Sequence, residues 1–192
     1  PVVEEALGEI ETQSERISQI VNRVRSYSKS ERRIHRPIQL PSVINQAIEN
    51  FRKTSLSKDV AVMAKFEENI IVSGNALELE LLFVNLLKNA AAAMRSLPQK
   101  AKRIQIQTQA TSAFVSITFE DNGPKVTDTV MENLSSPMKS TTTDGLGLGL
   151  TICRLIAEEH GGSIHFMRRV PNGLSAIVTL PSSSANPEDD QS

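Results

Sequence analysis

The sequence has little of several features that would assign it to a class at once. Its one cysteine, Cys153, falls in a helical pattern, which argues against a disulfide framework or cysteine metal site and favours packing in a reduced compartment. Lysine and arginine are scattered and the net charge is −1, so no basic stripe indicates nucleic-acid binding. No apolar run reaches the length of a membrane span, and no signal peptide opens the chain. We therefore expect a soluble, cytoplasmic protein that makes no membrane contact through this chain.

The length of 192 residues is enough for one ordinary α/β domain plus an appendage, and 39% of the residues are hydrophobic, as is normal for a chain that buries a core. The chain opens on Pro1 and not on methionine, so we expect a piece of a longer protein. Any membrane anchor or sensing domain would then lie upstream.

Residues 3–29 predict one long helix, because apolar side chains recur at spacings of mostly three, four or seven. These positions are Val3, Leu7, Ile10, Ile17, Val21 and Val24. A helix with such a narrow apolar seam needs partner helices, which suggests a dimer. A charged link follows, and Pro37 ends any helix there.

The remainder predicts strands segregated from helices, with hairpins, which favours an α+β fold: a two-layer α/β sandwich whose mixed sheet carries helices on one face. Residues 121–149 are polar and irregular, as in a functional lid, and residues 182–192 have the composition of a disordered tail. The expected strands are 38–40, 60–66, 70–72, 104–107, 115–119, 163–168 and 174–180, and the expected helices are 41–51, 75–97 and 151–160.

Three glycines at every second position, Gly145, Gly147 and Gly149, make a poor strand and a poor helix. They precede the helical pattern 151–160, so their N–H groups and the helix dipole favour an anion such as phosphate. The motif is neither a P-loop, which needs Lys-Ser/Thr after its last glycine, nor a Rossmann turn, which needs an apolar strand before it. The alternative is a flexible loop with a capped helix.

Asn85 and Asn89 lie four residues apart, hence on one face of a helix otherwise lined with leucine and alanine. Unpaired amides there would be costly, so something must satisfy them. They either cap nearby backbone or ligate a hard cation such as Mg²⁺ beside substrate phosphates.

Asp121 follows the apolar strand that ends at Phe119, and Gly123 comes two residues later. A carboxylate at a strand end, beside a glycine that lets a flat ring approach, can accept a hydrogen bond from the exocyclic amine of adenine. The alternative is a plain turn, because Asp, Asn, Gly and Pro all favour turns.

Taken together, three segments resemble the motifs of bacterial sensor histidine kinases in order and spacing. Residues 85–90 (NLLKNA) resemble the N box, 121–124 (DNGP) the first glycine box and 145–150 (GLGLGL) the second, and 160–164 (HGGSI) resemble the exit from the family's final helix. The resemblance implies the Bergerat ATP-binding fold shared with gyrase-type ATPases. It divides the chain into the second helix of a dimerisation and phosphotransfer hairpin (1–33), an ATP-binding catalytic domain (34–181) and a tail (182–192).

The resemblance also implies site residues, with ATP and Mg²⁺ as ligands. Asn89 would hold Mg²⁺, and Asp121 would accept a hydrogen bond from the adenine amine. Asn85 stands where hydrolysing relatives carry a general-base glutamate, so the resemblance predicts little ATP hydrolysis. The phosphoacceptor histidine would lie upstream of Pro1, a response regulator would take the phosphate, and the full protein would be a homodimer. The implied ATP-binding residues are Asn85, Lys88, Asn89, Asp121, Gly123, Lys139, Thr141, Thr142, Gly145, Leu146, Gly147, Leu148, Gly149 and Leu150.

Some positions depart from the family pattern. Lys125 replaces a glycine, Met138 an aromatic residue, and Thr142 a lysine, so the lid would close differently and Lys139 could supply the missing charge. Two alternative functions therefore stay open: a hydrolysing ATPase of the topoisomerase or chaperone type, and a non-catalytic scaffold that dimerises and senses nucleotide.

The three histidines have structural interpretations. His35 lies in the arginine-rich link, His165 lies in a strand pattern, and His160 lies where a cation suits a helix C-terminus.

Overall fold

A computed structural model describes residues 35–67, 69–98, 101–135 and 148–183. All of them belong to one unit, His35–Ser192, which is distinct from Pro1–Ile34. The predicted long helix at 3–29 therefore lies outside the described residues, as does most of the predicted tail. Of the predicted tail, the two described residues contact the domain: Ser182 N–H donates to the Ala113 carbonyl (2.9 Å) and Ser183 N–H to the Ile71 carbonyl (3.0 Å).

The centre of the domain is a five-stranded mixed sheet in the order β2-β4-β5-β7-β6. β2 pairs in parallel with β4, and every other neighbouring pair in this sheet is antiparallel. A separate two-stranded antiparallel sheet joins β1 (Arg36–Gln39) to β3 (Ile71–Gly74). The five strands are β2 (Val60–Lys65), β4 (Lys102–Ala110), β5 (Phe114–Asp121), β6 (Ser163–Arg168) and β7 (Leu174–Pro181).

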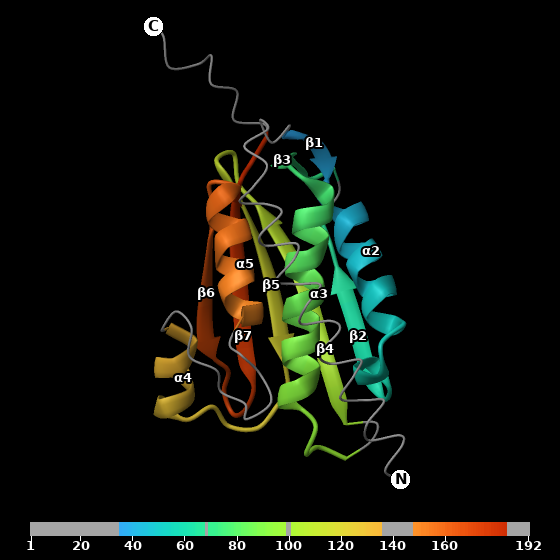
Figure 1. Ribbon diagram of the computed structural model, residues 1–192, viewed down its shortest axis with the longest axis vertical. Coiled ribbons are helices and arrows are strands. Elements are labelled where there is room, and N and C mark those ends of the chain that lie inside the picture. Colours follow the sequence, from blue (N-terminus) through green and yellow to red (C-terminus); the bar gives the residue numbers. More distant parts are fainter. Residues whose placement is uncertain (1–34, 68, 99–100, 136–147, 184–192) are drawn as a thin grey trace, which may run out of the picture. The chain divides into compact units, whose positions relative to one another are not determined.

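Three helices cover one face of the sheet, with α3 between α2 and α5 (Figure 1). The predicted α+β class and two-layer sandwich, with a mixed sheet and helices on one face, are thus confirmed. The helices are α2 (Leu40–Arg52), the short 3₁₀ turn η1 (Ser55–Ser57), α3 (Ala76–Ala93), α4 (Asp128–Ser135) and α5 (Leu148–Glu159).

The core lies between α3 and the sheet. Phe83 on α3 is fully buried and stacks on Phe119 of β5 with ring centroids 5.6 Å apart. Burying one such side chain contributes about 1.5–3 kcal/mol, so this contact fixes α3 over the end of β5. Asn75 begins α3 as its N-cap, where its side-chain oxygen accepts from the N–H groups of Leu77 and Glu78.

α5 ends in a Schellman motif. Gly161 has φ +70°, and Gly162 N–H donates to the Ala157 carbonyl at 2.8 Å. The predicted exit from the final helix, residues 160–164, therefore begins with a turn that has a physical basis in backbone geometry. No helix in the described part of the chain is long and apolar enough to cross a bilayer.

Two features of the fold were not predicted from the sequence. Residues 128–135 were expected to be irregular and instead form α4, a short polar helix in which Leu134 is the only buried side chain among the described residues 128–134. The strands on either side of Glu67 belong to different sheets, because β2 pairs with β4 while β3 pairs with β1. Both features depend on tertiary contacts that local sequence pattern does not encode.

Candidate functional site

The carboxylate of Asp121 occupies a position that a core side chain would otherwise take. Burial alternates along β5, and Val115, Ile117, Phe119 and Asp121 all face the helices. Asp121 is only 5% exposed. A buried carboxylate is costly unless it is hydrogen-bonded, so the groups around it matter.

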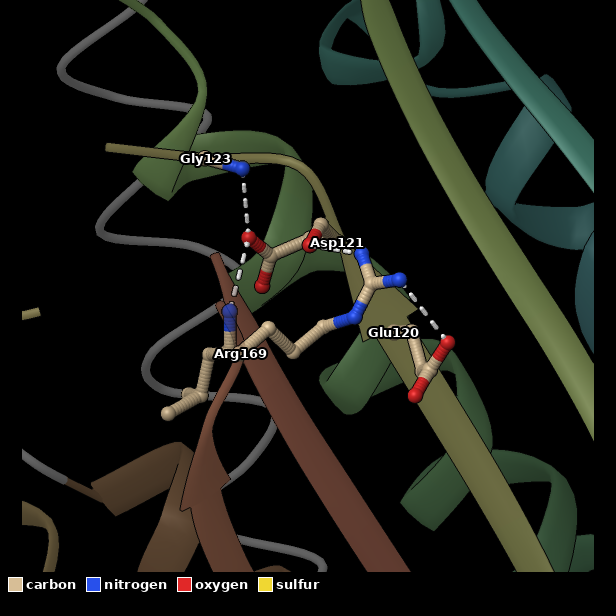
Figure 2. A network of polar contacts seen from close by, with 5 residues as sticks. Glu120, Asp121, Gly123 and Arg169 are labelled. Carbon is tan, nitrogen blue, oxygen red and sulfur yellow. Dashed lines mark hydrogen bonds and ion pairs between the residues drawn. The ribbon is translucent and has the colours of Figure 1, made fainter. Parts of the chain in front are cut away.

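Two backbone N–H groups bind the same oxygen of this carboxylate. Gly123 N–H donates to Oδ1 of Asp121 at 2.7 Å, and Leu174 N–H donates to it at 3.3 Å. In Figure 2 the dashed lines to the Asp121 carboxylate all end on one oxygen, which is Oδ1. In the described part of the chain, the carboxylate therefore presents Oδ2 as an acceptor for a ligand.

The charge of Asp121 is set by opposing effects. Burial raises the pKa of the carboxyl above its usual value and is the largest effect. The hydrogen bonds from Gly123 and Leu174 and the positive charge of Arg169 lower the pKa in the opposite direction. The surrounding donors thus favour the ionised form, which is the better hydrogen-bond acceptor.

The predicted first glycine box has two separate roles. Asn122 extends the pairing of β4 with β5, because its Oδ1 accepts from Arg103 N–H at 2.8 Å and its Nδ2 donates to the Ala101 carbonyl at 2.6 Å. Gly123 must lack a side chain, since a Cβ there would lie 2.7 Å from Oδ1 of Asp121. The motif is more than a plain turn, because it builds the surroundings of the carboxylate.

The hairpin between β6 and β7 closes on Asp121 from the other side. Gly173 has φ +98°, and a Cβ on it would lie 2.1 Å from the Asp121 carbonyl oxygen. Arg169 donates from Nη1 to that same carbonyl at 3.0 Å and pairs through Nη2 with Glu120 at 3.2 Å (Figure 2). Sequence reasoning missed this hairpin as part of the site, since its only signal was a turn at residues 171–173.

The two predicted asparagines differ in exposure. Asn85 on α3 is 6% exposed, and its Nδ2 is buried with no hydrogen-bond partner in the described residues. Asn89, one turn further on, is exposed, and Lys88 between them is half-buried. An orphaned donor of this kind costs about 1–3 kcal/mol, which is unusual for a purely structural amide.

The glycine segment is described only from Leu148 onward. Gly149 lies inside the first turn of α5, and a Cβ on it would be 4.0 Å from Oδ1 of Asn89. Leu150 is half-buried against the core. The remaining predicted lid residues, Lys139, Thr141, Thr142, Gly145, Leu146 and Gly147, lie outside the described residues, as does Met138.

The predicted residues that are described gather at one end of the domain. The C-terminal ends of α3 and β5 and the N-terminal end of α5 lie at the same end of the sheet (Figure 1). Asn89 adjoins Gly149, and Met94 at the end of α3 lies 3.6 Å from the Cβ position of Gly123. The N box, the carboxylate turn and the start of α5 are therefore neighbours.

One histidine prediction was wrong in its charge. His160 is buried, its Nδ1 lies 2.7 Å from the Ile156 carbonyl, and its Nε2 accepts from Asn75 N–H at 3.0 Å. Because Nε2 must act as an acceptor, the ring is neutral, and burial accordingly lowers its pKa. His35 stacks on this ring at 4.9 Å, and His165 lies exposed on β6.

The described residues contain no cluster of three or more His, Cys, Asp or Glu side chains that could hold a metal ion. A cation at this end of the domain would need the amide oxygens of α3 together with ligands from a bound molecule. Such a donor set suits Mg²⁺, which keeps several waters and commonly bridges substrate phosphates.

Comparison with known proteins gives consistent matches. Residues 74–184 match the family described as histidine kinase-, DNA gyrase B-, and HSP90-like ATPase. The C4-dicarboxylate transport sensor protein DctS of Rhodobacter capsulatus is 28% identical over 181 residues, covering 94% of this chain and 28% of DctS. Sporulation kinase B of Bacillus subtilis is 34% identical over 124 residues, covering 65% of this chain and 28% of that protein.

Among solved structures, the catalytic domain of histidine kinase ThkA superposes with a TM-score of 0.66 at 26% identity, covering 77% of this chain and 97% of that one. The chain spans under a third of the length of these two curated relatives.

Proposed function

The chain belongs to the family of histidine kinase-, DNA gyrase B- and HSP90-like ATPases, and on that premise we propose that it is the catalytic, ATP-binding part of a sensor histidine kinase. In this proposal it transfers the γ-phosphate of ATP to a histidine on a helix of the same protein upstream of Pro1. The phosphate then passes to an aspartate of a response regulator.

The observation that carries this proposal is the buried carboxylate of Asp121. The fold fixes Oδ1 with two backbone donors and presents Oδ2 at the end of β5, beside a glycine that leaves room for a flat ring. An acceptor in this place complements the exocyclic amine of adenine, whereas guanine has a carbonyl oxygen there that would be repelled. The site therefore favours ATP over GTP.

The amides of α3 fit the phosphate end of the nucleotide. Asn89 is exposed next to the first turn of α5, so its Oδ1 can serve as a ligand for Mg²⁺. The buried, unpartnered Nδ2 of Asn85 suits a phosphate oxygen or an ordered water. When bound, Mg²⁺ would neutralise charge on the phosphates, and the backbone N–H groups at the start of α5 would do the same.

The proposed lid extends the phosphate site. Gly145, Gly147 and Gly149 would form its hinge, and Lys139 would supply a positive charge that Thr142 cannot. Lys139→Ala should then weaken ATP binding. An unchanged affinity would remove Lys139 from the site.

Asn85 favours phosphotransfer over hydrolysis. An amide cannot take a proton from water, so the chain lacks the general base that a hydrolysing relative has at this position. Transfer to a well-placed histidine needs mainly positioning and charge neutralisation. Brisk ATP turnover by this chain alone would contradict the assignment of Asn85.

The proposed partners follow from the same scheme. The histidine kinase ThkA has been solved in complex with a response regulator protein, TrrA, and this chain would meet a protein of that class in the cytoplasm, where ATP is available. The full protein would be a homodimer through the predicted helix at residues 3–29, because the narrow apolar seam predicted for that helix needs a helical partner.

Nucleotide binding is the first test. Asp121→Asn keeps an oxygen for the two backbone donors but puts an N–H₂ group toward the adenine amine. Loss of a hydrogen bond to a charged acceptor costs about 1.5–3 kcal/mol, so calorimetry with Mg·ATP should show an affinity lower by about 10- to 100-fold. Asp128→Asn is the matched control, since Asp128 pairs with Arg168 on the surface. Equal affinity of the wild type and Asp121→Asn would contradict the adenine site.

Phosphotransfer is the second test. The chain is mixed with γ-labelled Mg·ATP and a separate protein that carries the complete helical hairpin with its histidine. A kinase labels that histidine, whereas a nucleotide-sensing scaffold leaves the hairpin unlabelled despite binding ATP. A hydrolysing ATPase instead releases inorganic phosphate whether or not the hairpin is present.

A further inference from the structure

Arg169 joins the hairpin between β6 and β7 to the end of β5. The strand β7 lies between β6 and β5, so this arginine reaches across it to Asp121 and Glu120 (Figure 2). Its Nη1 donates to the Asp121 carbonyl at 3.0 Å, and its Nη2 lies 3.2 Å from Oε2 of Glu120. The Arg169 side chain is 33% exposed and that of Glu120 is 26% exposed, so the pair is partly shielded from water.

Arg169 hydrogen-bonds to the backbone of Asp121 and not to its carboxylate. Consecutive side chains of a strand point to opposite faces, so an arginine that pairs with the Glu120 side chain cannot also bind the Asp121 carboxylate on the other face of the sheet. Arg169 instead binds the backbone carbonyl of Asp121 and the side chain of Glu120.

The same hairpin supplies a donor to the carboxylate. Arg169 N–H donates to the Gly173 carbonyl at 3.0 Å, which closes the turn, and Leu174 N–H follows directly with its hydrogen bond to Oδ1 of Asp121. The position of this donor therefore depends on where the turn is held against β5. The guanidinium charge adds to this effect, since it favours the ionised carboxylate.

From this geometry we propose that Arg169 is a positioning residue for adenine recognition, which fixes Asp121 so that the site distinguishes adenine from a purine without the amine. The inference rests on the proposed function, because it assigns a second residue to the same adenine site. Its role differs from that of Arg168, the preceding residue, whose partner is Asp128 of α4.

The test compares ATP with the triphosphate of purine riboside, which carries hydrogen where adenine carries the amine. Calorimetry with Mg²⁺ measures both affinities for the purified 192-residue chain and its Arg169→Met variant. The wild type should prefer ATP by about tenfold or more, the value of one hydrogen bond to a charged acceptor. In Arg169→Met the preference should fall to within about threefold, mainly through weaker ATP binding, as expected when that hydrogen bond is impaired.

Two further variants separate positioning from folding. Arg169→Lys keeps the charge and one donor, so its preference for ATP should lie between those of the wild type and Arg169→Met. Arg168→Met removes the same charge one residue away and should leave the preference unchanged. Thermal unfolding of each variant shows that the compared proteins are folded.

The outcomes distinguish this inference from the proposed function. If Arg169→Met weakens the binding of both nucleotides equally, the arginine is only structural and the inference is wrong. The same holds if Arg169→Lys, Arg169→Met and Arg168→Met all lower the preference for ATP to the same extent. It is also wrong if Arg169→Met keeps the wild-type preference. If the wild type binds neither nucleotide, or binds both equally, the proposed adenine site itself fails.

Discussion

Gly173 links the stability of the domain to the geometry of the site, and Gly173→Ala should damage both. At φ +98° an alanine costs about 1–2 kcal/mol. Its Cβ would also lie 2.1 Å from the Asp121 carbonyl oxygen, so the hairpin must move away from β5. That movement weakens the hydrogen bonds made by Arg169 N–H and Leu174 N–H, each worth about 0.5–1.5 kcal/mol.

These contributions give a destabilisation of roughly 2–4 kcal/mol, or a Tm lower by roughly 4–16 °C for a chain of this size. Affinity for Mg·ATP should also fall, by about tenfold, because the donor to Oδ1 of Asp121 is displaced. Differential scanning fluorimetry measures the first effect and calorimetry below the lowered Tm measures the second.

Gly161→Ala is a matched control. Gly161 also has positive φ, at +70°, but among the described residues a Cβ there meets only Pro181, with its nearest atom at 3.3 Å, and it lies at the other end of α5 from the site. This variant should lose about 1–2 kcal/mol of stability and keep its affinity for ATP. The reasoning is refuted if a folded Gly173→Ala protein binds ATP as tightly as Gly161→Ala does.

Three other predictions concern the core and the far end of the helices. Burial lowers the pKa of His160, so the unfolded chain binds more protons than the folded chain below a pH of about 6.5. The free energy of unfolding should therefore fall as the pH drops from that value through the folded pKa. Urea titrations from pH 8 to 5 test this, and His160→Gln should flatten the pH dependence. Leu87→Ala should lower the free energy of unfolding by about 2–5 kcal/mol, because Leu87 is fully buried. Leu77→Ala on the same helix should lower it by under about 0.5 kcal/mol, because Leu77 is 76% exposed. Equal losses in urea unfolding would contradict the packing of α3. Burial raises the pKa of Cys153 to about 12, so a thiol reagent should label it only after unfolding, and rapid labelling of the native protein would contradict its placement.

Most of the regular structure followed from sequence because its signals are local. The strict alternation in residues 104–107 and 115–119 predicted two strands, and they pair as the hairpin of β4 and β5. α4 was missed because Leu134 is its only buried side chain among residues 128–134, which leaves no apolar periodicity to detect. The parallel pairing of β2 with β4 is also invisible locally, since the partners lie about 40 residues apart in the register Val60 to Lys102.

The site was predictable only in part. Asp121, Asn85 and Asn89 stand out in the sequence because a polar side chain in an apolar pattern costs free energy unless a partner satisfies it. Arg169 does not stand out, because nothing in a turn sequence indicates that its side chain crosses β7 to a strand that ends 48 residues earlier. Hydrogen bonds to backbone carbonyls and N–H groups leave no residue-type signature.

The last strand in the described part of the chain is not at the edge of the sheet. β7 lies between β5 and β6, and its first residue, Leu174, gives a hydrogen bond to Asp121. During synthesis, a nascent chain that ends before residue 174 would leave β5 with an open edge and its carboxylate with one donor fewer. The five-stranded sheet can therefore close only after β7 has left the ribosome.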